Sequence, residues 1–148
     1  MARKRGARFE VRELVLSFLE ETDMLGNRDA IANVAVRDMA TARKFYEGTL
    51  GLEPVGTEDD ELIVFRSGNS TLNVYRSQYA GTNQATAVTW TVGDDIEGVV
   101  HALKAKGVSF EHYDMPGAKF EDDIHVFEDL KVAWFKDPDG NILNVVNR

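Results

Sequence analysis

Hydrophobic residues close to the N-terminus recur at the spacing of one helix face. The residues that carry this pattern are Val11, Leu14, Val15, Phe18 and Leu19. Apolar residues at i, i+3, i+4 and i+7 line one side of an α-helix, so we expect an amphipathic helix over residues 9–22 that ends before Gly26. Its apolar face must pack against the rest of the chain or against a second chain, and the sequence favours neither.

The remainder of the chain, residues 30–148, repeats one pattern of apolar and polar positions. Asp38 in the run VRD matches Asp94 in the run VGD, and Gly51 matches Gly107, each at an offset of 56 residues. In each copy, alternating residues predict a short strand before the Asp. The Asp is expected to cap a helix, and the Gly is expected to end it.

The second half of each copy also repeats. The run LNV occurs at residues 72–74 and again at 143–145, after the turns Ser-Gly-Asn and Asp-Pro-Asp-Gly-Asn. Turns of this composition connect antiparallel strands. Each unit is therefore predicted to contain a strand, a helix and three further strands, over about residues 30–77 and 86–148.

One segment interrupts the repeat. Residues 115–129 include Pro116, Gly117 and five acidic residues. We interpret this segment as a long loop, and long loops in compact domains are often functional lids. The expected organisation is a basic tip and amphipathic helix over residues 1–29, followed by one two-unit domain over residues 30–148.

Composition excludes several classes of function. The 148 residues include no cysteine, which excludes disulfides, zinc–thiolate sites and thiol catalysis. The net charge of -8 argues against nucleic acid as a partner, because phosphate binding needs a basic surface. We interpret the basic residues among the first eight positions as a solvated terminus. No apolar run approaches the roughly 18 residues of a membrane helix, and no signal peptide is apparent, so we expect a cytoplasmic protein with no membrane partner.

Two motifs resemble those of a known family. FYEGTLGL occupies residues 45–52, and AWFKDPDGN occupies residues 133–141. With the repeat between them, they are similar to the vicinal oxygen chelate superfamily, which contains glyoxalase I, bleomycin-resistance proteins, fosfomycin-resistance enzymes and extradiol dioxygenases. The resemblance covers residues 30–148. It implies an α+β fold in which two βαβββ units form an open, U-shaped mixed barrel around a pocket, with the N-terminal helix as an addition.

In metal-using members of this family, the first and last strands of each unit supply the metal ligands, commonly His or Gln and Glu. The resemblance and the repeat place the four corresponding positions at Ile31, Asn73, Ala87 and Asn144. Ile and Ala side chains cannot bind a metal, and neutral Asn oxygens do not make a catalytic metal site on their own. We therefore expect no bound metal and no other cofactor.

The three histidines are candidates for a metal site elsewhere in the chain. His101 is expected on a helix face, His112 on a strand near Asp114, and His125 within residues 115–129. The acidic neighbours of His125 are Glu121, Asp122, Asp123 and Glu128. A His–carboxylate site there stays open as an alternative, although acidic loops are usually solvated. No nucleophile elbow, phosphate-binding loop or convincing carboxylate pair identifies a catalytic residue.

Side chains alternate along a strand, so the positions that face the pocket can be predicted. The predicted ligand-binding residues are Asn33, Asn73, Tyr75, Thr89, Thr91 and Asn144. They would give a small, largely apolar lining with a few hydrogen-bonding groups, which is typical of sites for organic ligands. The same polar groups would also be explained if they merely paired with one another or with water.

Three hypotheses about function follow. The favoured one is metal-independent binding of a small organic molecule, of the resistance or sequestration type, by a cytoplasmic homodimer. The second is a lyase, isomerase or dioxygenase of the same superfamily with an atypical or vestigial site. The third is a closed pocket and a role in protein association through the N-terminal helix. The missing metal ligands favour a binding protein over an enzyme. If catalysis survives, the resemblance implies glyoxalase-like or dioxygenase-like chemistry.

Overall fold

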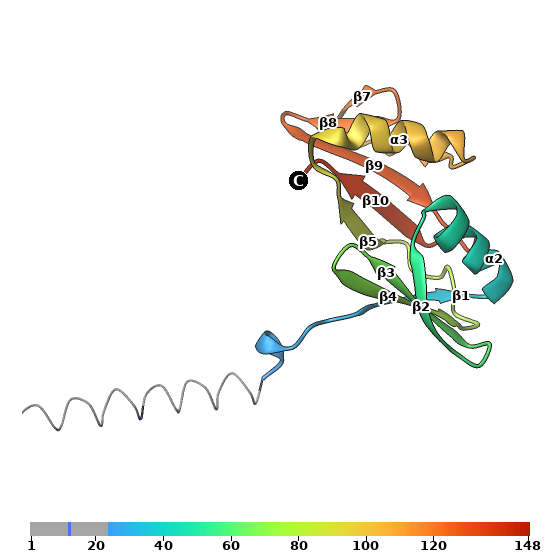
Figure 1. Ribbon diagram of the computed structural model, residues 1–148. Helices are drawn as coiled ribbons and strands as arrows, with labels where there is room; N and C mark the ends of the chain where they lie inside the picture. The colour runs from blue at the N-terminus through green and yellow to red at the C-terminus, as the bar shows by residue number, and fades with distance from the viewer. Residues whose placement is uncertain (1–11, 13–23) are drawn as a thin grey trace, which may run out of the picture. The chain divides into compact units, whose positions relative to one another are not determined.

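The computed structural model describes residue 12 and residues 24–148 of the chain (Figure 1). The helix predicted over residues 9–22 falls outside the described residues, apart from residue 12, and stays a prediction. Residue contacts divide the chain into two units, Met1–Ala30 and Ile31–Arg148. The described part of the first contains the short 3-10 helix η1 (Leu25–Asn27). Within the described residues, no helix is long and apolar enough to cross a membrane.

The first repeat forms a strand, a helix and three further strands. Its elements are β1 (Ala32–Val36), α2 (Met39–Arg43), the π-helix η2 (Lys44–Thr49), β2 (Glu53–Glu58), β3 (Leu62–Ser67) and β4 (Ser70–Arg76). The strands form one sheet in the order β1-β4-β3-β2, with β1 parallel to β4. As predicted, the Asp38 side chain caps the helix by accepting a 2.9 Å hydrogen bond from the Thr41 amide.

The second repeat has the same order of elements with one insertion. Its elements are β5 (Thr86–Thr91), the 3-10 helix η3 (Gly93–Asp95), α3 (Ile96–Ala105), β6 (Phe110–Glu111), β7 (Lys119–Glu121), β8 (Ile124–Phe127), β9 (Leu130–Lys136) and β10 (Ile142–Val146). The sheet order is β5-β10-β9-β8-β7, and β5 runs parallel to β10. The capping role predicted for Asp94 is wrong, because Asp94 lies within η3 and no side chain caps α3.

The loop predicted over residues 115–129 is also wrong in part. Strands β7 and β8 form a hairpin in this segment, and β8 pairs with the first half of β9. Asp122, which takes a positive φ of 52°, makes the turn between them. Asp tolerates this left-handed conformation better than most residues. The acidic neighbours conceal the strand signal of the run Ile-His-Val-Phe at residues 124–127.

The helix-facing sides of the two sheets contribute to one hydrophobic core. Val34 and Val74 of the first sheet and Leu143 and Val145 of the second are almost completely buried in it. Helix α3 covers the second sheet (Figure 1) and adds Leu103 to this core. Because side chains alternate along a strand, the residues between these positions lie on the opposite sheet faces. The opposite face of each sheet is therefore turned away from the shared core.

The turn between β9 and β10 joins the two repeats. Tyr46, on the π-helix η2, is fully buried and donates a 2.7 Å hydrogen bond to Oδ2 of Asp137. Within the turn, the Asp137 carboxylate accepts hydrogen bonds from the amides of Asp139 and Asn141. Asn141 Nδ2 reaches the carbonyl oxygen of Ala35 on β1 at 2.8 Å. The turn is thus a buried contact between the repeats as well as a hairpin connection.

Candidate functional site

Three of the predicted binding residues lie on the first sheet, on the face opposite the core. Asn33 and Asn73 are directly paired neighbours on β1 and β4, and Asn73 Nδ2 donates a 3.2 Å hydrogen bond to Asn33 Oδ1. Asn33 Nδ2 in turn donates to the carbonyl oxygen of Ile31 at 3.2 Å. Tyr75 pairs with Ala35 in the same register and is 38% exposed. The two amides therefore satisfy part of their hydrogen-bonding capacity within the sheet.

The other three predicted residues lie on the second sheet. Thr89 pairs with Asn144, and Thr91 pairs with Val146. Both threonines are exposed, whereas Asn144 is only 7% exposed. Among the described residues, no hydrogen bond links this set to the set on the first sheet. The structure thus brings Asn33 together with Asn73, and Thr89 together with Asn144.

A β-bulge alters the alternation predicted for β5. Thr86 pairs with Ile142 and Val88 pairs with Leu143, so Ala87 has no partner on β10. Consequently Thr86, the partner of Ile142, shares the sheet face of Asn144. The Trp134 indole nitrogen confirms this placement, because it donates a 3.1 Å hydrogen bond to Thr86 Oγ1. A bulge inserts one residue into a strand and breaks the two-residue period on which the prediction relied.

Three residues around Trp134 each have a buried side-chain atom without a hydrogen-bond partner in the described part of the chain. Its ring lies 4.8 Å from that of His125 and 5.5 Å from that of Tyr113, measured between centroids. Asn144 pairs with it directly across β9 and β10. The buried side-chain atoms that lack a hydrogen-bond partner among the described residues are Tyr113 Oη, His125 Nδ1 and Asn144 Oδ1. All three unpaired atoms therefore belong to the residues around Trp134, which we call the Trp134 cluster.

His125 is the fully buried member of the Trp134 cluster. Its Nε2 atom accepts a 2.9 Å hydrogen bond from the Tyr113 amide, which assigns the proton of the neutral ring to Nδ1. Burial lowers the pKa of His125, because the charged imidazolium loses its solvation. Burial also raises the pKa of Tyr113, with a smaller contribution from Glu111. The cluster is therefore uncharged near neutral pH and offers both hydrogen-bond donors and acceptors.

A cavity of about 260 Å³ lies beside the Trp134 cluster. Its lining includes Gln84, Thr86, Tyr113, Met115, Trp134 and Ile142. Aromatic and aliphatic walls with a few fixed polar groups are the usual composition of a small-molecule site. Tyr113, His125 and Trp134 were not among the binding residues predicted from the sequence. The hairpin register would have placed Trp134 beside Asn144, but the contacts of Tyr113 and His125 depend on a hairpin that was not predicted.

The residues at the predicted metal-ligand positions do not fit the metal site of the family that the sequence resembles. At the four positions that the resemblance predicts for metal ligands, Ile31 and Ala87 offer only hydrocarbon, and Asn73 and Asn144 offer neutral amides. Among residues 12 and 24–148, no group of three or more His, Asp or Glu side chains could hold a metal ion. Asp123 instead pairs with Lys104 at 2.6 Å and His112 at 2.7 Å, and these contacts lower the Asp123 pKa, Lys104 most strongly.

The sequence and the fold of this chain are similar to those of known proteins. The sequence model of the Glyoxalase/Bleomycin resistance protein/Dioxygenase superfamily matches residues 29–145. Fosfomycin resistance protein FosX from Mesorhizobium loti superimposes with a TM-score of 0.61 at 12% identity, covering 84% of this chain and 94% of that one. Lactoylglutathione lyase from Agrobacterium tumefaciens gives a TM-score of 0.59 at 18% identity, covering 80% and 91%. An integron cassette protein from the Halifax Harbour sewage outfall metagenome gives 0.60 at 19% identity, covering 80% and 96%.

These similarities confirm the predicted α+β fold of two βαβββ units with open, mixed sheets. At such low identities the structural matches concern the fold alone. No curated protein sequence matches the chain.

Proposed function

Because the chain belongs to the glyoxalase/bleomycin resistance/dioxygenase superfamily, we propose that it binds a small, neutral organic molecule at the Trp134 cluster without a metal. The observation that supports this function is the grouping of three unpaired polar atoms around one tryptophan beside a cavity. A buried polar group without a partner costs about 1–3 kcal/mol, and native proteins keep few of them. Three such atoms close together are typical of a binding site in which the ligand supplies the missing hydrogen-bond partners.

The chemistry of the cluster specifies a neutral polar ligand. Asn144 Oδ1 is an acceptor, the protonated Nδ1 of His125 is a donor, and the Tyr113 hydroxyl can act as either. All three atoms are buried, so a ligand reaches them only when a surrounding side chain turns aside. Met115, which is 36% exposed at the cavity, would then contact the ligand's apolar part. A charged ligand would be disfavoured, because the three side chains are uncharged and do not compensate its desolvation.

Independence from metal is supported by the residue types at the positions that the family resemblance assigns to metal ligands. The family resemblance assigns Ile31 and Ala87 to two of the four ligand positions, and no rearrangement turns either side chain into a ligand. The two remaining positions carry neutral amides. If the protein catalyses a reaction of the superfamily, that reaction must proceed without the family's metal site.

The test is a thermal-stability screen against metabolites and antibiotics, run with a chelator present. A ligand at 100 times its dissociation constant adds about 2.7 kcal/mol to the free energy of unfolding. Binding should be abolished by Met115→Trp, which fills the cavity, and retained by Val55→Trp, which adds the same side chain to the exposed strand β2. Hits that bind both variants equally, or that require a metal, would refute the proposal.

A homodimer is the second part of the proposal. Ile31 is 49% exposed and Tyr75 is 38% exposed, and both lie on or next to the polar face of the first sheet. Asn33, Thr89 and Thr91 are exposed as well. A second copy that covers these faces would enclose the predicted binding residues of both sheets.

A further inference from the structure

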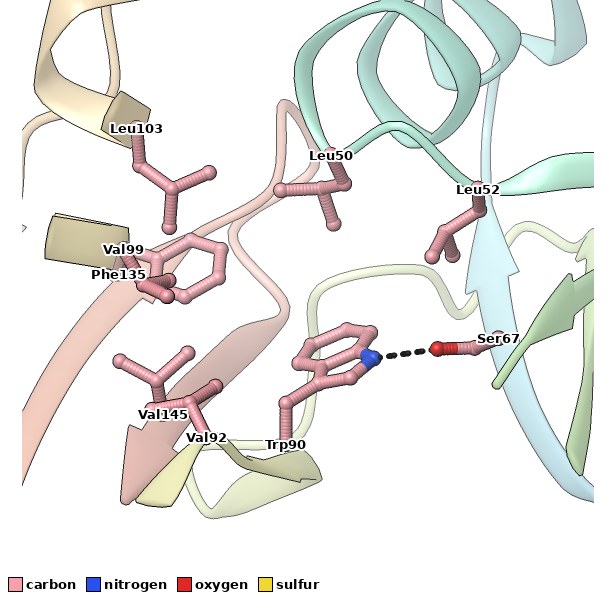
Figure 2. A pocket seen from close by; sticks show the side chains of 9 residues that line it. All are labelled: Leu50, Leu52, Ser67, Trp90, Val92, Val99, Leu103, Phe135 and Val145. Carbon is pink, nitrogen blue, oxygen red and sulfur yellow. Dashed lines mark hydrogen bonds between the residues drawn. The ribbon is translucent and has the colours of Figure 1, made fainter. Parts of the chain in front are cut away.

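A second cavity lies on the other side of the second sheet, between the two repeats. It has a volume of about 210 Å³ and is bounded by the end of η2, by α3, and by strands β3, β5, β9 and β10 (Figure 2). Leu50 and Ser67 come from the first repeat, whereas Trp90, Leu103 and Phe135 come from the second. The cavity therefore exists only where the two repeats meet.

The second sheet separates this cavity from the Trp134 cluster. Phe135 and Val145 line the cavity, and their chain neighbours Trp134 and Asn144 belong to the cluster. Adjacent residues of a strand point to opposite faces, so the two sites lie back to back. The residues that line one cavity do not line the other.

The lining of this cavity is almost entirely hydrocarbon. Trp90 and Phe135 stack with centroids 6.5 Å apart and an interplanar angle of 22°, which gives one aromatic wall. The Trp90 indole nitrogen donates a 2.8 Å hydrogen bond to Ser67 Oγ, drawn as a dashed line in Figure 2. This bond satisfies the indole N–H. No ionisable side chain contributes to the wall, so a charged ligand would find no compensating charge.

We propose that this cavity binds a small, uncharged aromatic molecule of one ring with a short substituent. An apolar cavity of about 150 Å³ lined by aliphatic and aromatic side chains is enough to hold benzene, so about 210 Å³ accommodates a substituted ring. Such a ligand gains dispersion contacts that the wall atoms otherwise lack. The ring can stack on Trp90 or Phe135, and the Ser67 hydroxyl can donate its proton to an acceptor on the substituent.

The burial of the walls favours a small molecule over a second protein. Phe135 is 1% exposed, Val145 is 3% exposed and Leu103 is 9% exposed. A protein surface cannot contact side chains that are this deeply placed, whereas a single ring can enter between them. The site is independent of the proposed function, because it uses the opposite face of the second sheet.

Toluene is a suitable probe, with benzoate as its charged counterpart. Toluene should raise the melting temperature of the wild-type protein and shift the methyl NMR signals of Leu50, Val99 and Leu103, whereas benzoate should do neither. Val99→Phe fills the cavity and should weaken toluene binding by about tenfold or more. Val55→Phe, the same change on the exposed strand β2, should keep wild-type affinity.

Two further variants keep the test decisive. Leu50→Phe fills the cavity from the first repeat, and it replaces Val99→Phe if that variant does not fold. Asn144→Leu alters the Trp134 cluster only and should bind toluene as the wild type does. The proposal is overturned if toluene changes neither the melting temperature nor the methyl signals, or if both filling variants bind it unchanged. Loss of toluene binding in Asn144→Leu would show that the probe occupies the other site.

Discussion

The Asn144 side chain is nearly buried, yet its Oδ1 atom has no hydrogen-bond partner. Asn73, the matching residue of the first repeat, uses its amide to donate to Asn33. Asn73 thus makes a hydrogen bond within the sheet, whereas the side-chain oxygen of Asn144 is available to a ligand. The ligand-binding role of Asn144 can therefore be separated experimentally from a structural one.

We expect Asn144→Leu to weaken binding of a true ligand by about 10- to 100-fold, because one hydrogen bond to a buried acceptor is lost. The melting temperature should stay the same or rise, since the variant removes an unpaired buried atom. Calorimetric titration and thermal unfolding of the same sample measure both quantities. A lower melting temperature with unchanged affinity would show that Asn144 is a structural residue.

His125 makes the stability of the fold depend on pH. Burial lowers its folded-state pKa, so below the unfolded-state value of about 6.5 the unfolded chain binds a proton that the folded chain does not. We expect the free energy of unfolding to fall as the pH decreases from 6.5 towards 5. Urea unfolding at a series of pH values measures this slope.

The variant His125→Gln should flatten the slope, and it keeps an acceptor for the Tyr113 amide. His101→Gln is the matched control, because His101 is exposed on α3 and should leave the slope unchanged. Asp123 and Glu97 do not obscure the test, since contacts with Lys104 and Lys131 lower their pKa values. Their contributions are lost only at pH values below about 4. An identical slope in His125→Gln would contradict the assignment.

The repeat in the sequence predicted most of the elements correctly. Matching positions around Asp38 and Gly51 indicated one strand, one helix and three strands per unit, because Asp is favoured at the start of a helix and Gly at its end. The hairpin β7–β8 was missed because its strand run is only four residues long and lies among acidic residues. The bulge at Ala87 was missed because a bulge leaves no local pattern.

The sequence predicted only those residues of the candidate site that lie on strands of the repeat. Thr89 and Asn144 could be placed on one face of the second sheet, since pairing and alternation follow from the strands themselves. Tyr113, His125 and Trp134 come together through the missed hairpin, so strand periodicity gave no signal for their contact. Non-local contacts of this kind are set by tertiary packing rather than by local sequence.

The hydrogen bond between Tyr46 and Asp137 connects the π-helix of one repeat to the turn of the other. Tyr46→Phe removes this bond and keeps the ring that packs against Phe65. Because the acceptor is a carboxylate, we expect the free energy of unfolding to fall by about 1.5–3 kcal/mol. Urea unfolding measures the change. The control Tyr79→Phe, at a side chain that is 69% exposed, should have no effect. Equal stability of the two variants would show that the repeats are joined mainly by apolar packing.

At the scale of the whole domain, the second sheet carries different chemistry on its two faces. The face towards α3 bounds an apolar cavity between the repeats, and the other face bears the unpaired polar groups around Trp134. The apolar cavity offers only the Ser67 hydroxyl to a polar ligand, whereas an apolar ligand would leave the polar atoms around Trp134 unpaired. The two proposed sites can therefore bind independently within a single chain.

The polar face of the first sheet, in contrast, lacks a cover within the described part of the chain. Ile31 and Tyr75 remain exposed there, beside Asn33 and Asn73. A second copy of the chain would bury these groups, so we expect a homodimer at micromolar concentration. Light scattering on the full-length protein, and on a truncated chain that begins at Asn27, measures the assembly and tests whether residues 1–26 are required for it.

Tyr75→Glu should weaken this dimer by about tenfold or more, because a carboxylate would be desolvated in the interface. Tyr79→Glu makes the same change at a residue that is 69% exposed and outside the sheets, and should leave the dimer intact. A monomeric full-length protein would refute the dimer altogether. A dimer that persists in the truncated chain but is weakened by Tyr75→Glu would place the interface on the first sheet and not on the N-terminal segment. A dimer that Tyr75→Glu leaves unchanged would show that another surface joins the two copies.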